Sequence, residues 1–255
     1  MLKIETILCR AGTMNNYSYL IYSDEPKVCV VIDPSEAAPI IQKLEQLDLQ
    51  PQYIFNTHHH FDHTDANLEL KNKYHAKVVG NQNDAERIPA FDLGLEPDNY
   101  YLLTPQGIKL IDKSDNGFTD SALLFQVIDV SAHTQGHVLY YFPNAKALFT
   151  GDTLFNLCIG GLFEGTPEQM FTALNKIRAL PDDTLFYPGH EYTFGGAHDA
   201  YQYHNGNQAI QDYLNKAQSR LQQGLPAGPY TLKEEKACNP YLAAASLTQF
   251  IDLFH

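Results

Sequence analysis

A run of metal-ligand side chains directly after a short apolar segment is the feature that most constrains this chain. Residues 57–63 read Thr-His-His-His-Phe-Asp-His and follow the apolar segment 53–55. Loops at the carboxyl ends of strands are where α/β proteins place their functional residues. Imidazole and carboxylate groups bind zinc and similar first-row ions. The run therefore predicts a metal site carried by an α/β fold.

The spacing within the run divides its side chains between two positions. Alternate side chains of an extended loop point to the same side, so His58 and His60 can bind one ion. Asp62 and His63 lie beyond them, where the backbone can turn both toward a second ion. His59 occupies the intervening position, and its side chain is expected to point away from the metals. A His-rich surface loop that binds nothing is the alternative interpretation.

The same arrangement recurs later in the chain. Three ligand-type residues each follow a segment that is predicted to be a strand: His133, Asp152 and His190. Taken singly, each would be assigned a structural role, but together with the first run they predict one site. His137 is expected to support that site or to fill the core rather than to bind metal. Asp33, which ends another apolar run, is expected either to orient a ligand or to end a strand in a turn.

The remaining pattern predicts an α/β body followed by a mainly helical region. Residues 28–32 form a continuous apolar run that suits a strand buried on both faces, and residues 36–48 have helical spacing. After His190 no convincing strand appears. Helices are expected there at residues 197–222, 231–237 and 241–254. We therefore divide the chain into residues 1–172, an α/β body, and residues 173–255, a mainly helical region that contributes His190.

Composition and charge exclude several classes of protein. The 255 residues carry 17 basic and 30 acidic side chains, which gives a formal net charge of -13. Such a surface repels phosphate backbones and anionic lipids, so no nucleic-acid partner is expected. No apolar run approaches the length of about 18 residues that a membrane span needs, and the N-terminus lacks the features of a signal peptide. Four scattered cysteines are typical of reduced thiols, and a cytoplasmic location is expected.

Together these motifs resemble the metallo-β-lactamase superfamily. The resemblance rests on the HxHxDH pattern of residues 58–63, followed in matching order and spacing by His133, Gly151-Asp152 and Gly189-His190. Three longer segments are similar, more narrowly, to glyoxalase II, the hydroxyacylglutathione hydrolases: residues 151–155 (GDTLF), 163–166 (FEGT) and 189–193 (GHEYT). The resemblance covers nearly the whole chain. It implies an αββα sandwich followed by a smaller, mainly helical C-terminal domain, with residues 1–172 as the catalytic domain and residues 173–255 as the substrate-binding region.

The resemblance also implies a ligand set for two divalent metal ions. Zinc is the expected metal, with iron and manganese as alternatives. The first ion takes His58, His60 and His133, and the second takes Asp62, His63 and His190. Asp152 and a hydroxide ion bridge the two metals.

The implied reaction is the hydrolysis of an acyl thioester, above all S-lactoylglutathione, to D-lactate and glutathione. Two neighbouring metal ions can share a water, lower its pKa toward about 7 and polarise a carbonyl oxygen. Asp152 and Asp62 are the predicted catalytic carboxylates, because the first bridges the ions and the second holds and orients the hydroxide. The sequence offers no alternative nucleophile, since it has no GxSxG motif and no cysteine beside a candidate base.

The residues expected to contact the substrate depart in part from the glyoxalase II pattern. Tyr192 and Phe163 lie in matching segments, but Gly161 stands where an Arg or Lys is usual, and no Lys or Arg follows Lys236. The loss of a charged partner should weaken binding of the glycine carboxylate of glutathione. Either another basic residue substitutes, or the enzyme prefers a different or smaller thiol. Two basic residues are candidates for the substitute: Lys146 and Arg178.

Other functions share part of this pattern. A persulfide dioxygenase, the leading alternative, would bind one iron in the first motif, but its segment after Gly-Asp-Thr differs from residues 163–166. A β-lactamase would share the metals but normally carries a signal peptide. A metallo-RNase is disfavoured by the acidic surface. A metal-binding scaffold with a degenerate site, the non-enzyme alternative, is disfavoured because every ligand type is present.

Overall fold

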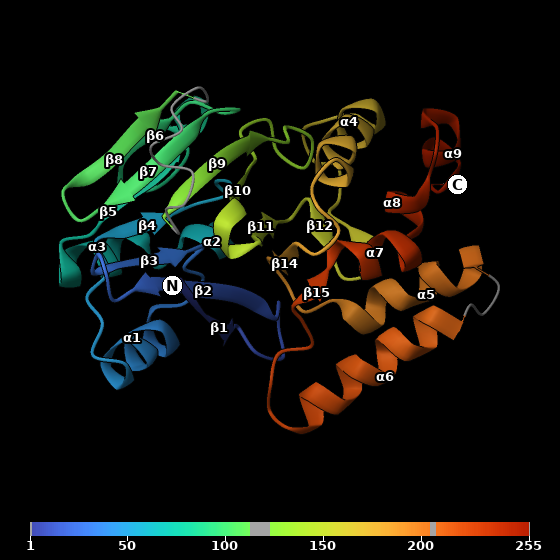
Figure 1. Cartoon of the computed structure of the whole chain (residues 1–255), viewed down its shortest axis with the longest axis horizontal. Coiled ribbons are helices and arrows are strands. Elements are labelled where there is room, and N and C mark those ends of the chain that lie inside the picture. Colours follow the sequence, from blue (N-terminus) through green and yellow to red (C-terminus); the bar gives the residue numbers. More distant parts are fainter. Residues whose placement is uncertain (1, 113–122, 205–207, 255) are drawn as a thin grey trace.

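Two β-sheets lie face to face between layers of helices in the computed structural model, which describes residues 2–112, 123–204 and 208–254 (Figure 1). The first sheet has the strand order β1-β2-β3-β4-β5-β6, and the second has the order β15-β14-β11-β10-β9-β7-β8. The expected αββα sandwich is therefore confirmed, as is the mainly helical C-terminal region that follows it.

The elements have the following bounds. The first sheet contains β1 (Lys3–Cys9), β2 (Asn16–Ser23), β3 (Val28–Ile32), β4 (Tyr53–Phe55), β5 (Lys77–Asn81) and β6 (Phe91–Leu95). The second contains β7 (Tyr100–Thr104), β8 (Gly107–Ile111), β9 (Leu124–Asp129), β10 (Val138–Phe142), β11 (Ala147–Gly151), β14 (Leu185–Pro188) and β15 (Tyr230–Thr231), and a separate pair contains β12 (Leu154–Phe155) and β13 (Cys158–Ile159). The helices are α1 (Ala37–Gln46), α2 (Phe61–Thr64), α3 (Asn67–Tyr74), α4 (Pro167–Arg178), α5 (Thr193–His204), α6 (Gln208–Gln222), α7 (Leu232–Cys238), α8 (Pro240–Ala243) and α9 (Leu247–Asp252). None of the helices in the described ranges has the length and hydropathy that a membrane crossing requires.

Alternation along the strands lets one segment pack against two layers. In β3, Val28, Val30 and Ile32 pack between the two sheets, whereas Cys29 and Val31 pack with α1 and α3. In the second sheet β10 alternates in the same way, with one face between the sheets and the other toward α4 and the C-terminal helices. Burial on both faces is what the continuous apolar run predicted, because neither face of these strands meets water.

Some elements differ from those that the apolar pattern predicted. β6, β7 and β8 occupy a stretch to which no element was assigned, and most of their side chains are half-buried or exposed, which weakens the pattern. The single helix expected over 197–222 is two helices, α5 and α6. The helix expected over 241–254 is also divided. There Ser246 accepts a hydrogen bond from the backbone N–H of Gln249 and begins α9.

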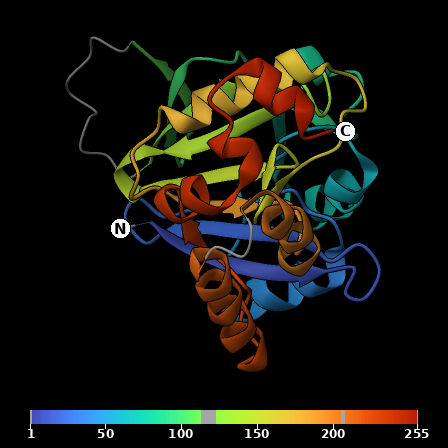
Figure 2. The same cartoon turned by 90° about the vertical axis from the view of Figure 1, so that its right-hand side faces the viewer.

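β15 attaches the helical region to the second sheet. It pairs antiparallel with β14, opposite Leu185 and Phe186, so the expectation of no strand after His190 was wrong. Helices α4 to α9 share one apolar cluster with the outer face of this sheet, and the C-terminal helices lie in front in the view of Figure 2. The division after residue 172 falls inside α4 and stays a prediction.

Candidate metal centre

The loops that carry the expected ligands meet at one edge of the sandwich. β9, β11 and β14 run in the same direction, so their carboxyl ends lie together and bring His133, Asp152 and His190 to one place. The run that begins at His58 follows β4 of the facing sheet. A cavity of about 400 Å³ opens at this edge. It is lined by Met14, His60, Phe61, Asp62, His133, Asp152, Phe155, Gly161, Phe163, His190 and Tyr192.

Three histidines form the first of two donor clusters. Nδ1 of His60 lies 3.0 Å from Nε2 of His58 and 3.1 Å from Nε2 of His133. The ligand atoms of all three lie within 4.8 Å of one another. Three ring nitrogens that face one point cannot all be satisfied by hydrogen bonds among themselves, because a neutral imidazole has only one N–H. They form a donor set that suits a metal cation.

A carboxylate and two histidines form the second cluster. Oδ2 of Asp62 lies 3.3 Å from Nε2 of His190 and 3.5 Å from Nε2 of His63. The two ring nitrogens are 3.3 Å apart, and all three side chains are buried. These are the residues that the resemblance assigned to the second ion, and they offer the same imidazole and carboxylate chemistry.

Asp152 touches both clusters. Its Oδ2 lies 3.6 Å from Nε2 of His133, a member of the first cluster, and 3.3 Å from Nε2 of His190, a member of the second. Its Oδ1 lies 3.2 Å from Nε2 of His63, yet it is buried and accepts no hydrogen bond of acceptable geometry. A buried carboxylate oxygen without a partner is costly. The position of Asp152 between the clusters therefore fits a pair of bound cations.

Two histidines of the clusters are oriented by backbone carbonyls on their far side. Nδ1 of His133 lies 2.7 Å from the carbonyl oxygen of Gly161, and Nδ1 of His190 lies 2.9 Å from that of Met14. Since a carbonyl only accepts hydrogen bonds, Nδ1 carries the proton in both rings. Nε2 is then left to face the cavity, which is the arrangement that metal-binding histidines usually adopt.

Asp33 performs both of the roles that the sequence left open. Its Oδ2 lies 3.1 Å from Nδ1 of His63 and so orients that ring. The same carboxylate accepts hydrogen bonds from the backbone N–H and the hydroxyl of Thr57, each at 2.7 Å. Asp33 also has a backbone φ of 47°, which ends the strand in a turn.

His137 supports the site, as expected, without facing either cluster. It is fully buried, and its ring stacks on that of His58 with the ring centres 4.7 Å apart. Its Nε2 accepts a hydrogen bond of 3.1 Å from the backbone N–H of Asp152. The ring therefore fixes the turn that carries the carboxylate touching both clusters.

The two clusters differ in charge. Burial lowers the pKa of His60 to about 4, so the first cluster contains neutral imidazole. Burial opposes protonation of His190 too, but the charge of Asp152 and hydrogen bonds to both carboxylates outweigh it and raise its pKa to about 9. The hydrogen bond from His190 and the charge of His63 hold the pKa of Asp62 below its usual range, although burial opposes them. The carboxylates of Asp62 and Asp152 therefore favour positive charge at the second cluster, carried either by protons or by a metal cation.

Two glycines permit the close approach of these loops. Gly151 has a φ of +46°, and a Cβ there would lie 2.4 Å from the hydroxyl of Thr57. A Cβ at Gly189 would lie 2.3 Å from Oδ1 of Asp152. Distances this short cannot be accommodated, so the glycines that precede Asp152 and His190 are required by steric contact.

One residue of the site could not be predicted from the sequence. Asn16, the first residue of β2, donates a hydrogen bond of 2.9 Å from Nδ2 to Oδ2 of Asp62 and lies 3.4 Å from Nε2 of His190. It is fully buried, and its backbone forms an isolated bridge with His190. Asn16 and Asp62 are 46 positions apart, so no local pattern could indicate this contact.

The three residues expected to contact substrate all line the cavity. The ring of Tyr192 stacks on that of His190, with the ring centres 4.7 Å apart and the planes 12° from parallel. The ring of Phe163 meets His133 edge-on at 5.1 Å. Gly161 is exposed and supplies the carbonyl that orients His133. Their contact with substrate stays a prediction.

Neither basic residue named as a substitute cation lies at the cavity. Lys146 forms an ion pair with Asp183, and Arg178 donates to the backbone carbonyls of Leu242 and Tyr241. Among the described residues, those that line the cavity include no Lys and no Arg. The expectation that Lys146 or Arg178 replaces the usual cation is therefore not supported by their positions.

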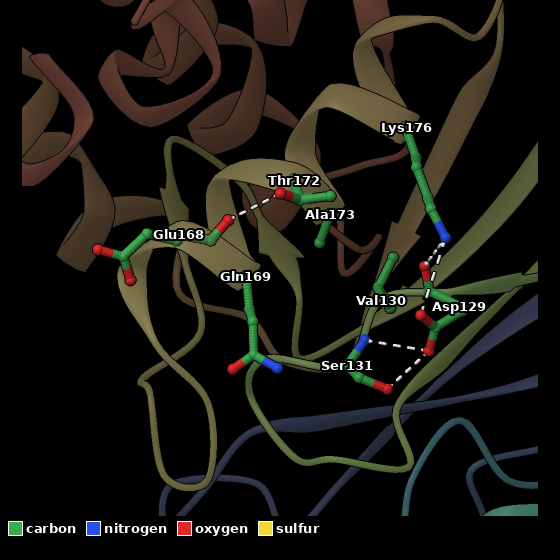
Figure 3. A pocket seen from close by; sticks show the side chains of 8 residues that line it. All are labelled: Asp129, Val130, Ser131, Glu168, Gln169, Thr172, Ala173 and Lys176. Atoms are coloured by element: carbon green, nitrogen blue, oxygen red, sulfur yellow. Dashed lines mark hydrogen bonds and ion pairs between the residues drawn. The ribbon is translucent and has the colours of Figure 1, made fainter. Parts of the chain in front are cut away.

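A second, smaller cavity of about 260 Å³ lies beside α4 and the end of β9 (Figure 3). Lys176 reaches across it to Asp129 and also pairs with Asp98, while the hydroxyl of Ser131 donates to the Asp129 carboxylate. These charged groups already have partners, and none of the predicted site residues lines this cavity. The cavity at the two donor clusters, which the predicted residues line, is therefore the candidate site.

Comparison with known proteins agrees with this fold. Residues 11–190 match the metallo-beta-lactamase superfamily, and residues 191–251 match the hydroxyacylglutathione hydrolase C-terminus. The crystal structure of the BLEG-1 B3 metallo-beta-lactamase superposes with a TM-score of 0.67 at 22% identity, over 95% of this chain and 100% of its own. The crystal structure of ETHE1 from Myxococcus xanthus has a TM-score of 0.70 at 25% identity, over 98% and 89%. The two-sheet fold is that of the metallo-β-lactamase superfamily.

Relatives with a known name identify the family within this superfamily. A hydroxyacylglutathione hydrolase of Pelagibacter ubique is 38% identical over 99% of this chain and 97% of its own length. One from Synechococcus sp. (strain JA-3-3Ab) is 38% identical over 92% of this chain and 87% of its own. The chain belongs to the hydroxyacylglutathione hydrolase family.

Proposed function

We propose that this chain hydrolyses acyl thioesters of glutathione, above all S-lactoylglutathione, with two bound divalent metal ions. The observation that carries the proposal is the contact of Asp152 with both donor clusters at a cavity open to substrate. Near full-length relatives named hydroxyacylglutathione hydrolase support the choice of substrate. Zinc is the proposed metal, because imidazole and carboxylate donors suit it.

The proposed ligands come from the two clusters. The first ion is assigned to His58, His60 and His133, and the second to Asp62, His63 and His190, with Asp152 contacting both. Metal ions there would supply a water of lowered pKa as the nucleophile and would stabilise negative charge on the carbonyl oxygen. The converging ring nitrogens support this assignment, as does the buried Oδ1 of Asp152, which accepts no hydrogen bond.

The chain's own side chains would orient the reactants. Asp62 is ionised, and Asn16 holds its Oδ2 in place, so Asp62 can accept a hydrogen bond from the attacking water. The rings of Phe163 and Tyr192 flank the cavity and would contact the thiol part of the substrate. Residues 173–255 supply His190 and Tyr192, which supports their assignment as a substrate-binding region.

Metal content together with turnover tests the proposed function. We expect the protein purified without chelator to contain close to two metal ions per chain by elemental analysis, because the ligands form two clusters joined by Asp152. The same preparation should release free thiol from S-lactoylglutathione. One iron per chain with oxygen consumption would favour the dioxygenase instead. Two metals without thioester turnover would favour the metal-binding scaffold.

A second candidate substrate, the thioester of a thiol other than glutathione, is favoured by one specific observation. The described lining of the cavity is rich in aromatic rings and contains no Lys or Arg to pair with a carboxylate. We therefore expect Gly161→Arg to lower KM for S-lactoylglutathione about 10-fold, since a charge-assisted hydrogen bond contributes roughly 1.5–3 kcal/mol. The atoms nearest to a Cβ at Gly161 are ring atoms of Phe163 at 3.4–3.9 Å, which is ordinary van der Waals contact, so a Cβ is accommodated there.

Two comparisons isolate the effect of charge at Gly161. KM for the lactoyl thioester of N-acetylcysteamine, which lacks a carboxylate, should not change in Gly161→Arg. Gly107→Arg adds the same charge in β8, where a Cβ meets no atom within 4 Å, and should leave both KM values unchanged. Equal effects of Gly161→Arg on both substrates would show that position 161 does not face the glutathione carboxylate.

A further inference from the structure

Four charged or titratable side chains form a network beside the first donor cluster, and the function proposed above uses none of them. They are His59, Asp84, Arg87 and Glu164, here called the Arg87 network. His59 lies within the ligand run, and Glu164 lies in the FEGT segment. Asp84 is fully buried at the end of the short 3₁₀ helix η1 (Gln82–Asp84) that follows β5.

Arg87 bridges two carboxylates from distant parts of the chain. Its Nε donates to Oδ1 of Asp84 at 2.7 Å, and its Nη1 donates to Oε1 of Glu164 at 2.6 Å. Nδ1 of His59 lies 3.1 Å from the other oxygen of Asp84, and Nε2 of His59 lies 3.8 Å from Glu164. The bridge therefore joins the loop of the first ligands, the segment after β5 and the loop that contains Glu164.

Glu164 in turn fastens its loop to the one that carries His133. Its Oε2 accepts a hydrogen bond of 2.8 Å from the backbone N–H of Gln135, and the side-chain amide of Gln135 donates to the Glu164 carbonyl at 2.8 Å. A Cβ at Gly165 would lie 2.4 Å from the carbonyl oxygen of Ala132, so the two loops are in close contact.

The loop held in this way contacts the first donor cluster at two places. The carbonyl of Gly161 orients the ring of His133 at 2.7 Å. The ring of Phe163 lies edge-on to His133 at 5.1 Å and to His60 at 5.4 Å, although 72% of Phe163 is exposed. An aromatic side chain this exposed is held by few contacts of its own, so its position depends on the loop. Displacement of this loop would change the orientation of His133 and the mouth of the cavity together.

We propose that Arg87 is a positioning residue, which holds His133 for metal binding and Phe163 for substrate binding through its bridge from Asp84 to Glu164. The inference rests on the metal site proposed above but not on the choice of thiol. Outer contacts of this kind are commonly worth 10- to 100-fold in metal affinity, because they fix the ligand before the ion arrives. Arg suits the position, because its planar group reaches two carboxylates at once and a Lys cannot reproduce that geometry.

The test compares Arg87→Met with a matched variant, Lys176→Met. Lys176 also bridges two carboxylates, those of Asp98 and Asp129, and its side chain is 34% exposed against 37% for Arg87. It lies in the smaller cavity, away from the donor clusters. We expect Arg87→Met to weaken zinc binding about 10-fold in a competition titration against a chelating dye and to raise KM several-fold with less change in kcat. Lys176→Met should change neither quantity.

Two further variants keep the test decisive. Arg87→Lys should recover part of the zinc affinity, because it restores the charge without the bridge. Glu164→Gln should weaken zinc binding as Arg87→Met does, because it removes the charge that pairs with Arg87. Its amide oxygen can still accept the hydrogen bond from the backbone N–H of Gln135, so the loop stays attached. This variant therefore tests the proposal even if Arg87→Met does not fold. Zinc affinities in Arg87→Met and Glu164→Gln equal to that of Lys176→Met would overturn the proposal. Since zinc affinity is measured without substrate, this outcome is distinct from a failure to hydrolyse thioesters.

Discussion

Asp152→Ala is expected to lower kcat/KM for S-lactoylglutathione at least about 1,000-fold while the chain remains folded. Asp152 lies 3.6 Å or less from histidines of both clusters, so its removal takes away the one described carboxylate that contacts them together. Metal ions contribute several kcal/mol to transition-state stabilisation, and about 4 kcal/mol corresponds to a thousandfold in rate. The fold should persist, because Asp152 belongs to none of the three apolar clusters.

Steady-state kinetics, circular dichroism and metal analysis on one preparation check this expectation. Asp183→Ala is the matched control, because Asp183 is an exposed carboxylate whose partner is Lys146, away from the cavity. It should retain the wild-type rate. A folded Asp152→Ala protein that kept more than about a tenth of the wild-type activity would contradict the assignment of Asp152, since a tenfold loss is only about 1.36 kcal/mol.

Removal of bound metal is expected to lower the melting temperature by roughly 10 °C. Without a cation, the facing ring nitrogens of His58, His60 and His133 have no common partner. The buried Oδ1 of Asp152 also accepts no hydrogen bond. A ligand present at about 1,000 times its Kd stabilises the folded state by about 4 kcal/mol. For a chain of this size each kcal/mol shifts the melting temperature by roughly 2–4 °C.

Calorimetry before and after dialysis against a chelator measures the effect, and excess zinc should restore the original melting temperature. The same treatment of Asp152→Ala should produce a smaller shift, because that variant has lost the carboxylate that contacts both donor clusters. Identical melting temperatures for the treated and untreated wild type, in a preparation shown to contain metal before dialysis, would mean that the histidines and carboxylates are satisfied without metal.

The features that the sequence predicted are those that depend on short-range spacing. The pairing of His58 with His60 follows from alternation along the loop after β4, whereas Asp62 and His63 follow where the chain turns into α2, and the clusters contain all four as expected. His133, Asp152 and His190 were predictable because each follows an apolar strand, and the carboxyl ends of strands that run in one direction meet at the same edge. Strands buried on both faces were equally evident, since a short continuous apolar run between turn residues is typical of such a strand.

The features that escaped prediction depend on contacts between distant segments. Asn16 reaches Asp62 across 46 positions, and Arg87 reaches Glu164 across 77, so neither has a local pattern around it. The edge strand β8 was missed because its side chains are exposed or half-buried, and β7 was missed because four of its five residues are apolar or aromatic, so its sequence shows no alternation although its burial does. β15 was missed because a two-residue strand is too short to show any period. In each case the tertiary partner, rather than the segment itself, determines the conformation.

The pairing of β15 with β14 limits how this chain can be shortened. In the second sheet β14 lies between β11 and β15, and β14 leads directly into His190. A chain that stopped before Tyr230 would leave the outer hydrogen-bonding edge of β14 bare, next to a ligand of the second cluster. Bare strand edges invite association between chains. The helical C-terminal region is therefore also the cover of a sheet edge, and it cannot be lost or exchanged as a separate module without exposing the strand that carries His190.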